Sequence, residues 1–376
     1  MTQGTAPART TARETAPQEG RADGILLAVR ELTVRFRMRG GREIAAVTDA
    51  SFDLAAGECL ALVGESGCGK SVLASALLGL LPGNARTGGR ALLYGGAARH
   101  TDGGPGGGTA SGGLDLLAAD EATLARTVRG RRVGLVPQSP AAHLTPVRTV
   151  RAQLSETVRE LTGARGPALA EATRAAAERA AFPAGHLDRY PHQLSGGLAQ
   201  RAATALALVA DAPLLLADEP TTGLDRELVQ RTVDELRGHA DDGRGLLIIT
   251  HDLAAAERVA DRVAVMYAGR IVELCDAHAF FGRPGPRHPY ARGLLEALPE
   301  RAFVPVPGIP PELGDLPEGC AFAPRCARAS AACATVPALT DGVACHHPVA
   351  PGAPTTPGAG PTGAAERENA GEGSAA

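Results

Sequence analysis

The feature that most constrains the fold is a glycine-rich segment of eight residues between an apolar run and an apolar helical pattern. Residues 64–71 read Gly-Glu-Ser-Gly-Cys-Gly-Lys-Ser, which fits the pattern G-x-x-x-x-G-K-[ST]. The run Cys59–Val63 precedes this segment, and a helix is predicted to begin near Val72. A strand, a glycine-rich turn and a helix in this order are typical of α/β proteins that bind phosphate at the helix start. The segment therefore predicts a phosphate-binding loop.

The loop carries the only lysine of the chain. Of 38 basic residues, Lys70 is the single Lys and all the others are Arg. An ammonium is a compact point charge, whereas a guanidinium is a broad planar fork, so position 70 requires the smaller cation. We expect Lys70 to reach the β- and γ-phosphates and Ser71 to supply a hydroxyl to Mg²⁺. The candidate nucleotide-binding residues here are Gly64, Glu65, Ser66, Gly67, Cys68, Gly69, Lys70, Ser71 and Val72.

Short apolar runs predict the strands of a parallel sheet that is covered on both faces, with helical patterns between several of them. These runs are Cys59–Val63, Val133–Val136, Leu214–Ala217, Leu246–Thr250 and Val263–Tyr267. A further run, Leu32–Phe36, alternates apolar and polar residues and is predicted to be an edge strand. The pattern indicates the α/β fold class.

Polar side chains follow three of these runs. Asp218 and Glu219 follow Leu214–Ala217, Gln138 lies after Val133–Val136, and His251 follows Leu246–Thr250. Ligands of open α/β sheets bind at the carboxyl ends of the strands. We therefore expect Asp218 to hold Mg²⁺, mostly through water, and Glu219 to polarise the attacking water. We expect His251 to hold the γ-phosphate and this water, and the Gln138 amide to reach both Mg²⁺ and the water. Taken alone, strands that end in solvated polar residues are the structural alternative.

A second glycine-containing segment precedes a helix. The run Leu194-Ser195-Gly196-Gly197 comes directly before an Ala/Leu-rich helix that is predicted to start near Leu198. Ser195 is a favourable N-cap residue, and the glycines Gly196 and Gly197 permit close approach of the backbone to a ligand. The segment is therefore a candidate anion-binding helix terminus, with a simple capped helix as the structural alternative.

In this order, the motifs resemble the full set of the ABC ATPases. The resemblance spans residues 30–275 and includes Asp225, at the end of Pro220-Thr221-Thr222-Gly223-Leu224-Asp225. It implies a P-loop NTPase (RecA-like) core with an inserted helical subdomain, and two such domains that dimerise head to tail. Each ATP then lies between the phosphate loop of one subunit and the Leu194–Gly197 segment of the other. ATP holds the dimer closed and hydrolysis releases it. Family members usually carry Gln where this chain has Leu198.

Further runs resemble the oligopeptide, dipeptide and nickel importer branch of this family. They are Gln138-Ser139-Pro140 followed by Leu144-Thr145-Pro146-Val147, Asp261–Glu273, His288-Pro289-Tyr290, and Leu294–Pro299. With them, the resemblance covers roughly residues 28–347 apart from a glycine-rich insertion. The resemblance implies an ATP-binding and ATP-hydrolysing subunit that powers the import of oligopeptides or dipeptides.

The same resemblance implies the partners. They are a second ABC ATPase subunit (a paralogue or a second copy), integral-membrane permease subunits and, indirectly, an extracytoplasmic substrate-binding protein. The chain would then lie at the cytoplasmic face of the membrane. An importer of nickel or another small solute is one alternative. A soluble ABC ATPase acting on ribosomes or DNA is another, although such relatives usually carry two motif sets, a long coiled coil or zinc-bearing segments.

The C-terminal part carries four cysteines within a Pro-rich segment that is poor in apolar residues. They are Cys320, Cys326, Cys333 and Cys345. A metal centre would supply folding energy that such a segment lacks. Paired zinc knuckles and the compact ferredoxin spacing are both missing. The run Ala323-Pro324-Arg325-Cys326 resembles the extension of peptide-permease ATPases, which favours a [4Fe–4S] cluster; Zn²⁺, with His346 and His347 nearby, and no metal remain the alternatives.

Composition sets the remaining limits. A formal net charge of −3, 3% aromatic residues and no Trp argue against a nucleic-acid partner. No apolar stretch reaches the roughly 18 residues that cross a bilayer. The predicted organisation is a disordered tail (1–22), the ATPase domain (23–275) with a flexible insertion (95–113) and a helical subdomain (about 139–199), a Pro-rich extension (276–319), the cysteine segment (320–347) and a second tail (348–376).

Overall fold

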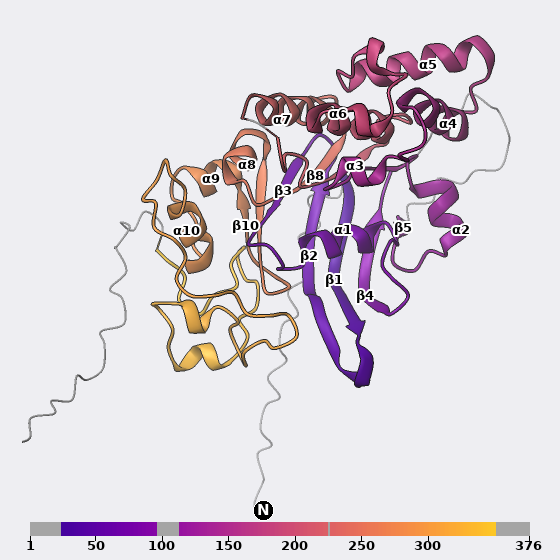
Figure 1. The fold of residues 1–376 in the computed structure, drawn as a ribbon. Helices are drawn as coiled ribbons and strands as arrows, with labels where there is room; N and C mark the ends of the chain where they lie inside the picture. Colours follow the sequence, from indigo (N-terminus) through magenta and orange to yellow (C-terminus); the bar gives the residue numbers. More distant parts are fainter. Residues whose placement is uncertain (1–23, 96–112, 225, 351–376) are drawn as a thin grey trace, which may run out of the picture.

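The computed structural model describes residues 24–95, 113–224 and 226–350 (Figure 1). The predicted tail 1–22 lies outside the described residues, as do Asp225, most of the insertion 95–113 and most of the tail 348–376. The boundaries of the other predicted segments stay predictions.

A six-stranded sheet forms the centre of the molecule, with the strand order β10-β9-β3-β8-β7-β6. All neighbours are parallel except β9 and β10, which are antiparallel. The parallel strands confirm the apolar runs predicted to form a parallel sheet. Their bounds are β3 Cys59–Val63, β6 Val133–Val136, β7 Leu214–Asp218, β8 Gly245–Thr250, β9 Arg262–Tyr267 and β10 Arg270–Asp276.

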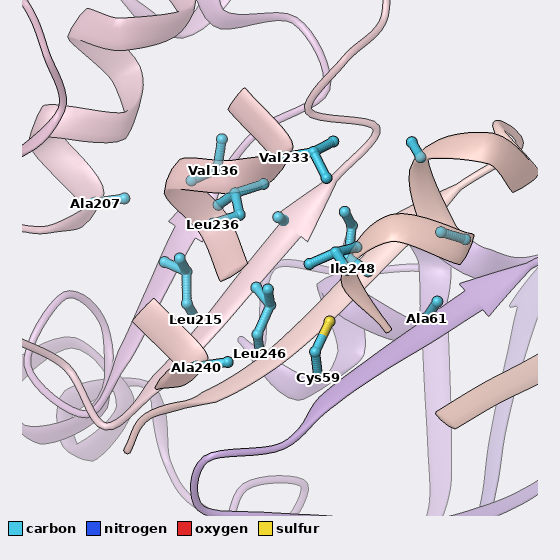
Figure 2. Packing of buried hydrophobic residues seen from close by; sticks show 14 of the residues in the cluster. Cys59, Ala61, Val136, Ala207, Leu215, Val233, Leu236, Ala240, Leu246 and Ile248 are labelled. Carbon is cyan, nitrogen blue, oxygen red and sulfur yellow. The ribbon is translucent and has the colours of Figure 1, made fainter. Parts of the chain in front are cut away.

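This sheet is covered on both faces, as predicted. Along β8, Leu246 and Ile248 belong to one buried cluster, whereas Leu247 and Ile249 belong to another, because successive side chains of a strand point to opposite faces. In the first cluster, Leu236 and its neighbours on helix α7 (Arg226–Asp241) pack over the strands (Figure 2). Full burial of one such Leu stabilises the fold by about 1.5–3 kcal/mol.

A four-stranded sheet of order β2-β1-β4-β5 packs into the second cluster, together with helix α1 (Lys70–Leu77). Its strands are β1 Ile25–Arg37, β2 Glu43–Ala55, β4 Ala85–Leu93 and β5 Leu114–Asp115. The prediction that Leu32–Phe36 forms an edge strand is wrong, because β1 lies between β2 and β4. In this run Leu32 and Val34 are buried and Arg35 is exposed. The alternation of apolar and polar residues therefore arises because one face of this antiparallel sheet packs on the core and the other faces solvent.

Helices connect the strands. Between β6 and β7 lie α3 (Pro140–His143), α4 (Val150–Thr162), α5 (Gly166–Arg179) and α6 (Gly196–Ala207). The ends of α4 follow from its sequence, since the Thr149 hydroxyl accepts a hydrogen bond from the N–H of Ala152 and Gly163 ends the helix with a φ of 75°. The remaining helices are α2 (Glu121–Thr123), α8 (Leu253–Val259), α9 (Ala277–Phe281) and α10 (Pro289–Glu296).

After α10, the described chain forms a loop-rich segment that packs beside β10, coloured yellow in Figure 1. Its short 3-10 helices are Ala323–Arg325 and Ala331–Ala334. The Leu274 N–H donates to the Gly342 carbonyl at 2.8 Å, which ties the segment to β10. Phe322 is 4% exposed and belongs to the first buried cluster, so the segment is anchored on the main core. No helix within the described ranges has the length and apolarity to cross a membrane.

Candidate functional site

The strands β3, β8, β7 and β6 end together at one edge of the six-stranded sheet. Pairs near their ends are Val63 with Thr250, Ile249 with Asp218, and Ala217 with Val136. Because the strands are parallel and in register, the residues that follow them meet at this edge. These residues are the loop that starts at Gly64, the acidic residue Glu219, the imidazole of His251 and the amide of Gln138.

The loop after β3 encloses the lysine. Lys70 is 6% exposed, and its Nζ donates to the carbonyl of Gly64 at 2.8 Å and to that of Glu65 at 3.0 Å. Lys70 is also the first residue of α1, so the ammonium and the free N–H groups of the helix start lie together. Burial raises the pKa of the neighbouring Cys68 thiol. The loop thus presents a fixed positive charge and a helix start to one region.

Glycine is required at position 69 by two independent constraints. Gly69 has a φ of 106°, and a Cβ there would lie 2.2 Å from the carbonyl oxygen of Ala46. We expect Gly69→Ala to lower the free energy of unfolding by about 3 kcal/mol or more, since the backbone must shift. Gly67 (φ 82°) has open space at its Cβ, so Gly67→Ala costs only about 1–2 kcal/mol. Calorimetric unfolding of both variants checks this; equal losses would contradict the steric argument.

The predicted metal ligands Ser71 and Asp218 are in contact. The Ser71 hydroxyl donates to Oδ1 of Asp218 at 3.0 Å. Burial raises the pKa of Asp218; the hydrogen bond from Ser71 opposes this shift and the charge of Glu219 adds to it. A hydroxyl and a carboxylate are hard oxygen donors of the kind that Mg²⁺ prefers. The two side chains therefore fit Mg²⁺. Burial disfavours the charged form of Asp218, and a cation bound beside it would stabilise that form.

Glu219 and His251 form a pair beside these ligands. Glu219 is 6% exposed, and its Oε2 lies 2.5 Å from Nδ1 of His251. Glu219 adopts a φ of 48°, which is uncommon for a residue other than glycine, and its N–H donates to the carbonyl of Ile249 at 2.8 Å. The Thr222 hydroxyl also reaches Oε2 of Glu219 at 3.4 Å, a contact that the sequence reasoning missed. The geometry holds a carboxylate and an imidazole at the sheet edge.

Gln138 is less closely associated with this group. It follows β6 with one residue between them, and it is exposed. Among the described residues, no hydrogen bond joins its amide to Ser71, Asp218 or Glu219. The structure therefore places Gln138 at the correct edge of the sheet without bringing it into contact with the predicted ligands.

The second glycine segment caps α6 and lies at the surface. The Ser195 hydroxyl accepts a hydrogen bond from the N–H of Leu198 at 3.4 Å. Ser195 and Gly196 are exposed, whereas Gly197 is buried against the side chain of Leu228. In the part of the chain that the structure describes, no hydrogen bond joins this segment to the loop Gly64–Ser71. The helix start is thus available to a ligand from outside the chain.

The four C-terminal cysteines lie in one segment, but they do not form a ready metal site. Burial raises the pKa of Cys326, and the nearby Cys320 and Cys333 thiols raise it further. Burial likewise raises the pKa of Cys320 and of Cys345. Over the described ranges, no group of three or more His, Cys, Asp or Glu side chains is arranged to hold a metal ion. The predicted [4Fe–4S] or Zn²⁺ centre is therefore not supported, because spacing along the chain does not fix where the sulfurs point.

A contact between the loop and the C-terminal segment had no signal in the sequence. The Arg325 guanidinium bonds both carboxylate oxygens of Glu65. The two residues are 260 positions apart; Glu65 was predicted to bind nucleotide and Arg325 lies in the cysteine segment, but nothing in the sequence paired them. A periodic or local pattern cannot report such a pair.

Comparisons with known proteins agree with this geometry. The ABC transporter family matches residues 47–222, and the C-terminal region of oligopeptide/dipeptide transporters matches residues 272–333. A putative peptide import ATP-binding protein of Brucella melitensis biotype 1 is 40% identical over 344 residues, covering 86% of this chain and 95% of the relative. The oligopeptide transport ATP-binding protein OppD of Salmonella typhimurium is 37% identical, covering 87% and 93%.

Solved structures show the same fold. The dimeric structure of a bacterial ABC transporter cassette matches with a TM-score of 0.57 at 22% identity, covering 67% of this chain and 99% of the cassette. The structure of cbiO1 from Clostridium perfringens matches with a TM-score of 0.55 at 24% identity, covering 69% and 91%. Together with the phosphate loop and the acidic strand end, these relationships show that the chain belongs to the ATP-hydrolysing subunits of the ABC transporter family.

Proposed function

We propose that this chain binds and hydrolyses ATP to power the import of oligopeptides or dipeptides through separate membrane subunits. The observation that carries the proposal is the group formed by Lys70, Ser71, Asp218, Glu219 and His251 at one sheet edge. Its parts supply a cation for phosphate, hard oxygen ligands for a metal, and a buried carboxylate beside an imidazole. The peptide class is supported by relatives 37–40% identical to this chain, which are named as peptide import and oligopeptide transport ATP-binding proteins.

The residues at the edge have distinct roles in this proposal. Lys70 and the N–H groups of Gly64–Ser71 hold the β- and γ-phosphates. Ser71 and Asp218, with Gln138 brought in from β6, would hold Mg²⁺, which supplies charge neutralisation on the phosphate oxygens. The carboxylate of Glu219 orients the attacking water and accepts a proton from it as a general base.

His251 positions the carboxylate of Glu219. Its Nδ1 lies 2.5 Å from Oε2 of Glu219, so the other ring nitrogen, Nε2, would contact the γ-phosphate and the water. His251 is exposed, so its imidazole is accessible to a nucleotide bound at the sheet edge. The contact therefore links Glu219, which polarises the water, to His251, which contacts the γ-phosphate.

The second half of the nucleotide site comes from a partner subunit. The exposed helix start at Ser195–Gly197 of one subunit would close over the nucleotide held by Gly64–Ser71 of the other, with Asp225 near the same interface. The partner is a second copy or a paralogue. Permease subunits in the membrane bind the pair of ATPase subunits at the cytoplasmic face, and the closing and opening of the pair drives transport through them. An extracytoplasmic binding protein delivers the peptide to the permease subunits.

A [4Fe–4S] cluster on the four cysteines is the finer part of the proposal, with Zn²⁺ as the alternative. Its basis is the sequence alone: Cys320, Cys326, Cys333 and Cys345 fall within one short segment, although the described residues are not arranged as a ready metal site. We expect anaerobically purified protein to be brown and to absorb near ~400 nm, and Cys326→Ser to remove this absorbance. Colourless protein that contains neither iron nor zinc by elemental analysis would reject the cluster.

The test of the proposed function uses the whole transporter. The chain is purified with the membrane subunits encoded beside it and reconstituted into vesicles, and uptake of a labelled tripeptide is measured with Mg-ATP on the cytoplasmic side. We expect ATP-dependent uptake that Glu219→Gln abolishes. Uptake of Ni²⁺ instead of peptide would contradict the peptide class, and failure to co-purify with any membrane subunit would contradict a role in transport.

A further inference from the structure

The C-terminal segment reaches the phosphate loop through one buried arginine. The guanidinium of Arg325 donates from Nη1 to Oε2 of Glu65 at 2.7 Å and from Nη2 to Oε1 at 3.0 Å. Glu65 is the second residue of the loop Gly64–Ser71, and Arg325 ends the 3-10 helix Ala323–Arg325. Two parallel bonds between a planar fork and a carboxylate fix orientation as well as distance. The pair thus joins the two regions rigidly.

The arginine is fully engaged at this position. Its side chain is 4% exposed, its Nε donates to the carbonyl of Pro307 at 2.7 Å, and its Nη1 also donates to the Tyr267 hydroxyl at 3.2 Å. Its Cζ lies 5.7 Å from the centre of the Tyr267 ring and 5.8 Å from that of Phe322. Burying a charge is costly unless it is paired and hydrogen-bonded. The surroundings are therefore built to hold this guanidinium in one place.

The C-terminal region holds the backbone of Glu65 as well. The Glu65 N–H donates to the hydroxyl of Tyr290 at 2.9 Å, and Tyr290, on α10, is fully buried. The carbonyl of the same Glu65 accepts a hydrogen bond from Nζ of Lys70 at 3.0 Å. Arg325 thus holds the side chain of Glu65 and Tyr290 holds its N–H. The carbonyl of Glu65 helps to position the ammonium of Lys70, which is proposed to bind the phosphates.

We propose that Arg325 is a positioning residue of the nucleotide site: through Glu65 it holds the phosphate loop in the conformation that places Lys70 for ATP. The loop is rich in glycine and would otherwise lose more conformational entropy when it wraps the phosphates. By bonding to Glu65, Arg325 orders the loop before ATP binds, so less conformational entropy is lost on binding. This role rests on the proposed binding of ATP at Gly64–Ser71 and is independent of the transported solute.

A purely structural role is the competing explanation, in which the pair only fastens the C-terminal segment. The two explanations differ in what they change. A fastening pair affects stability and leaves the affinity for ATP alone. A positioning pair affects ATP binding, and its two members act as one unit, so that breaking both costs no more than breaking one. A double-mutant cycle on ATP affinity therefore separates them.

The experiment compares Arg325→Gln, Glu65→Gln and the double variant in the full transporter complex, by Mg-ATP equilibrium binding and by steady-state hydrolysis. We expect each single variant to raise the Kd and KM for ATP about tenfold with kcat within about threefold of wild type, and the double variant to match the singles. Arg325→Lys keeps the charge but loses the fork, so an intermediate increase is expected. It also serves if Arg325→Gln folds poorly.

Arg328→Gln is the matched control, because Arg328 lies in the same segment, is exposed, and donates to the carbonyl of His347 rather than to the loop. It should leave the Kd for ATP unchanged. If Arg325→Gln and Glu65→Gln lower the melting temperature but bind ATP like Arg328→Gln, the positioning role is refuted. If the wild-type complex itself fails to bind Mg-ATP, the proposed function fails, and that outcome is distinct.

Discussion

Glu219→Gln is expected to abolish ATP turnover while ATP still binds. Glu219 is buried, and its Oε2 lies 2.5 Å from Nδ1 of His251, so its carboxylate is held at the sheet edge beside Asp218. An amide has the same shape and can still contact the imidazole, but it cannot accept the proton of the attacking water. Loss of a positioned general base costs about 10²–10⁴-fold in rate. We therefore expect hydrolysis to fall by that factor.

The nucleotide-bound state should then accumulate. In the proposed mechanism ATP binding favours the closed pair and hydrolysis reopens it, so we expect a variant that binds ATP without cleaving it to stay closed. Sedimentation or size-exclusion analysis with Mg-ATP measures this. Glu227→Gln is the control, since Glu227 is exposed on α7 and pairs with Arg231 at 2.6 Å. Wild-type turnover in Glu219→Gln would refute the role given to Glu219.

Lys70→Arg is expected to be nearly as damaging as Lys70→Ala. Nζ of Lys70 lies within hydrogen-bond distance of the carbonyls of Gly64 and Glu65 at 2.8 and 3.0 Å, and the residue is 6% exposed. A guanidinium is wider and cannot enter this space without displacing the loop. We expect both variants to lose at least about 100-fold in kcat/KM for ATP, equivalent to about 2.7 kcal/mol of transition-state stabilisation.

The control for this exchange is Arg174→Lys, the same exchange in reverse at an exposed position whose guanidinium pairs with Glu171. It should leave hydrolysis unchanged, which shows that the effect at position 70 is local. Steady-state kinetics with purified complex measure all three variants. Ordinary ATPase activity in Lys70→Arg would contradict the argument from shape.

The parts of the site that could be predicted from the sequence are those set by short stretches of chain. The strand Leu214–Ala217 ends in two acids, and the loop Gly64–Ser71 follows a strand, so each motif is complete within about ten residues. The parallel sheet then brings their ends together, because the carboxyl ends of parallel strands meet at one edge. Local pattern and one rule of sheet geometry were sufficient.

Features that depend on long-range pairing could not be predicted in this way. The alternation in Leu32–Phe36 reported a half-buried face but not the neighbours of β1, which pairs with both β2 and β4. The contact of Glu65 with Arg325 joins residues 260 apart. The four cysteines in one short Pro-rich segment suggested a metal centre. The positions of their sulfurs depend on the path of the loop in space, and among the residues that the structure describes they form no ready metal site.

In the proposed site, a single nucleotide is held by the lone ammonium of Lys70 and closed over by the helix start at Ser195 of a partner subunit. Equilibrium binding of Mg-ATP to the purified complex, compared between wild type and Lys70→Ala, tests it most directly. We expect saturable, Mg²⁺-dependent binding to the wild type and at least about a hundredfold weaker binding to the variant. Equal binding by both, or none by the wild-type complex, would contradict it.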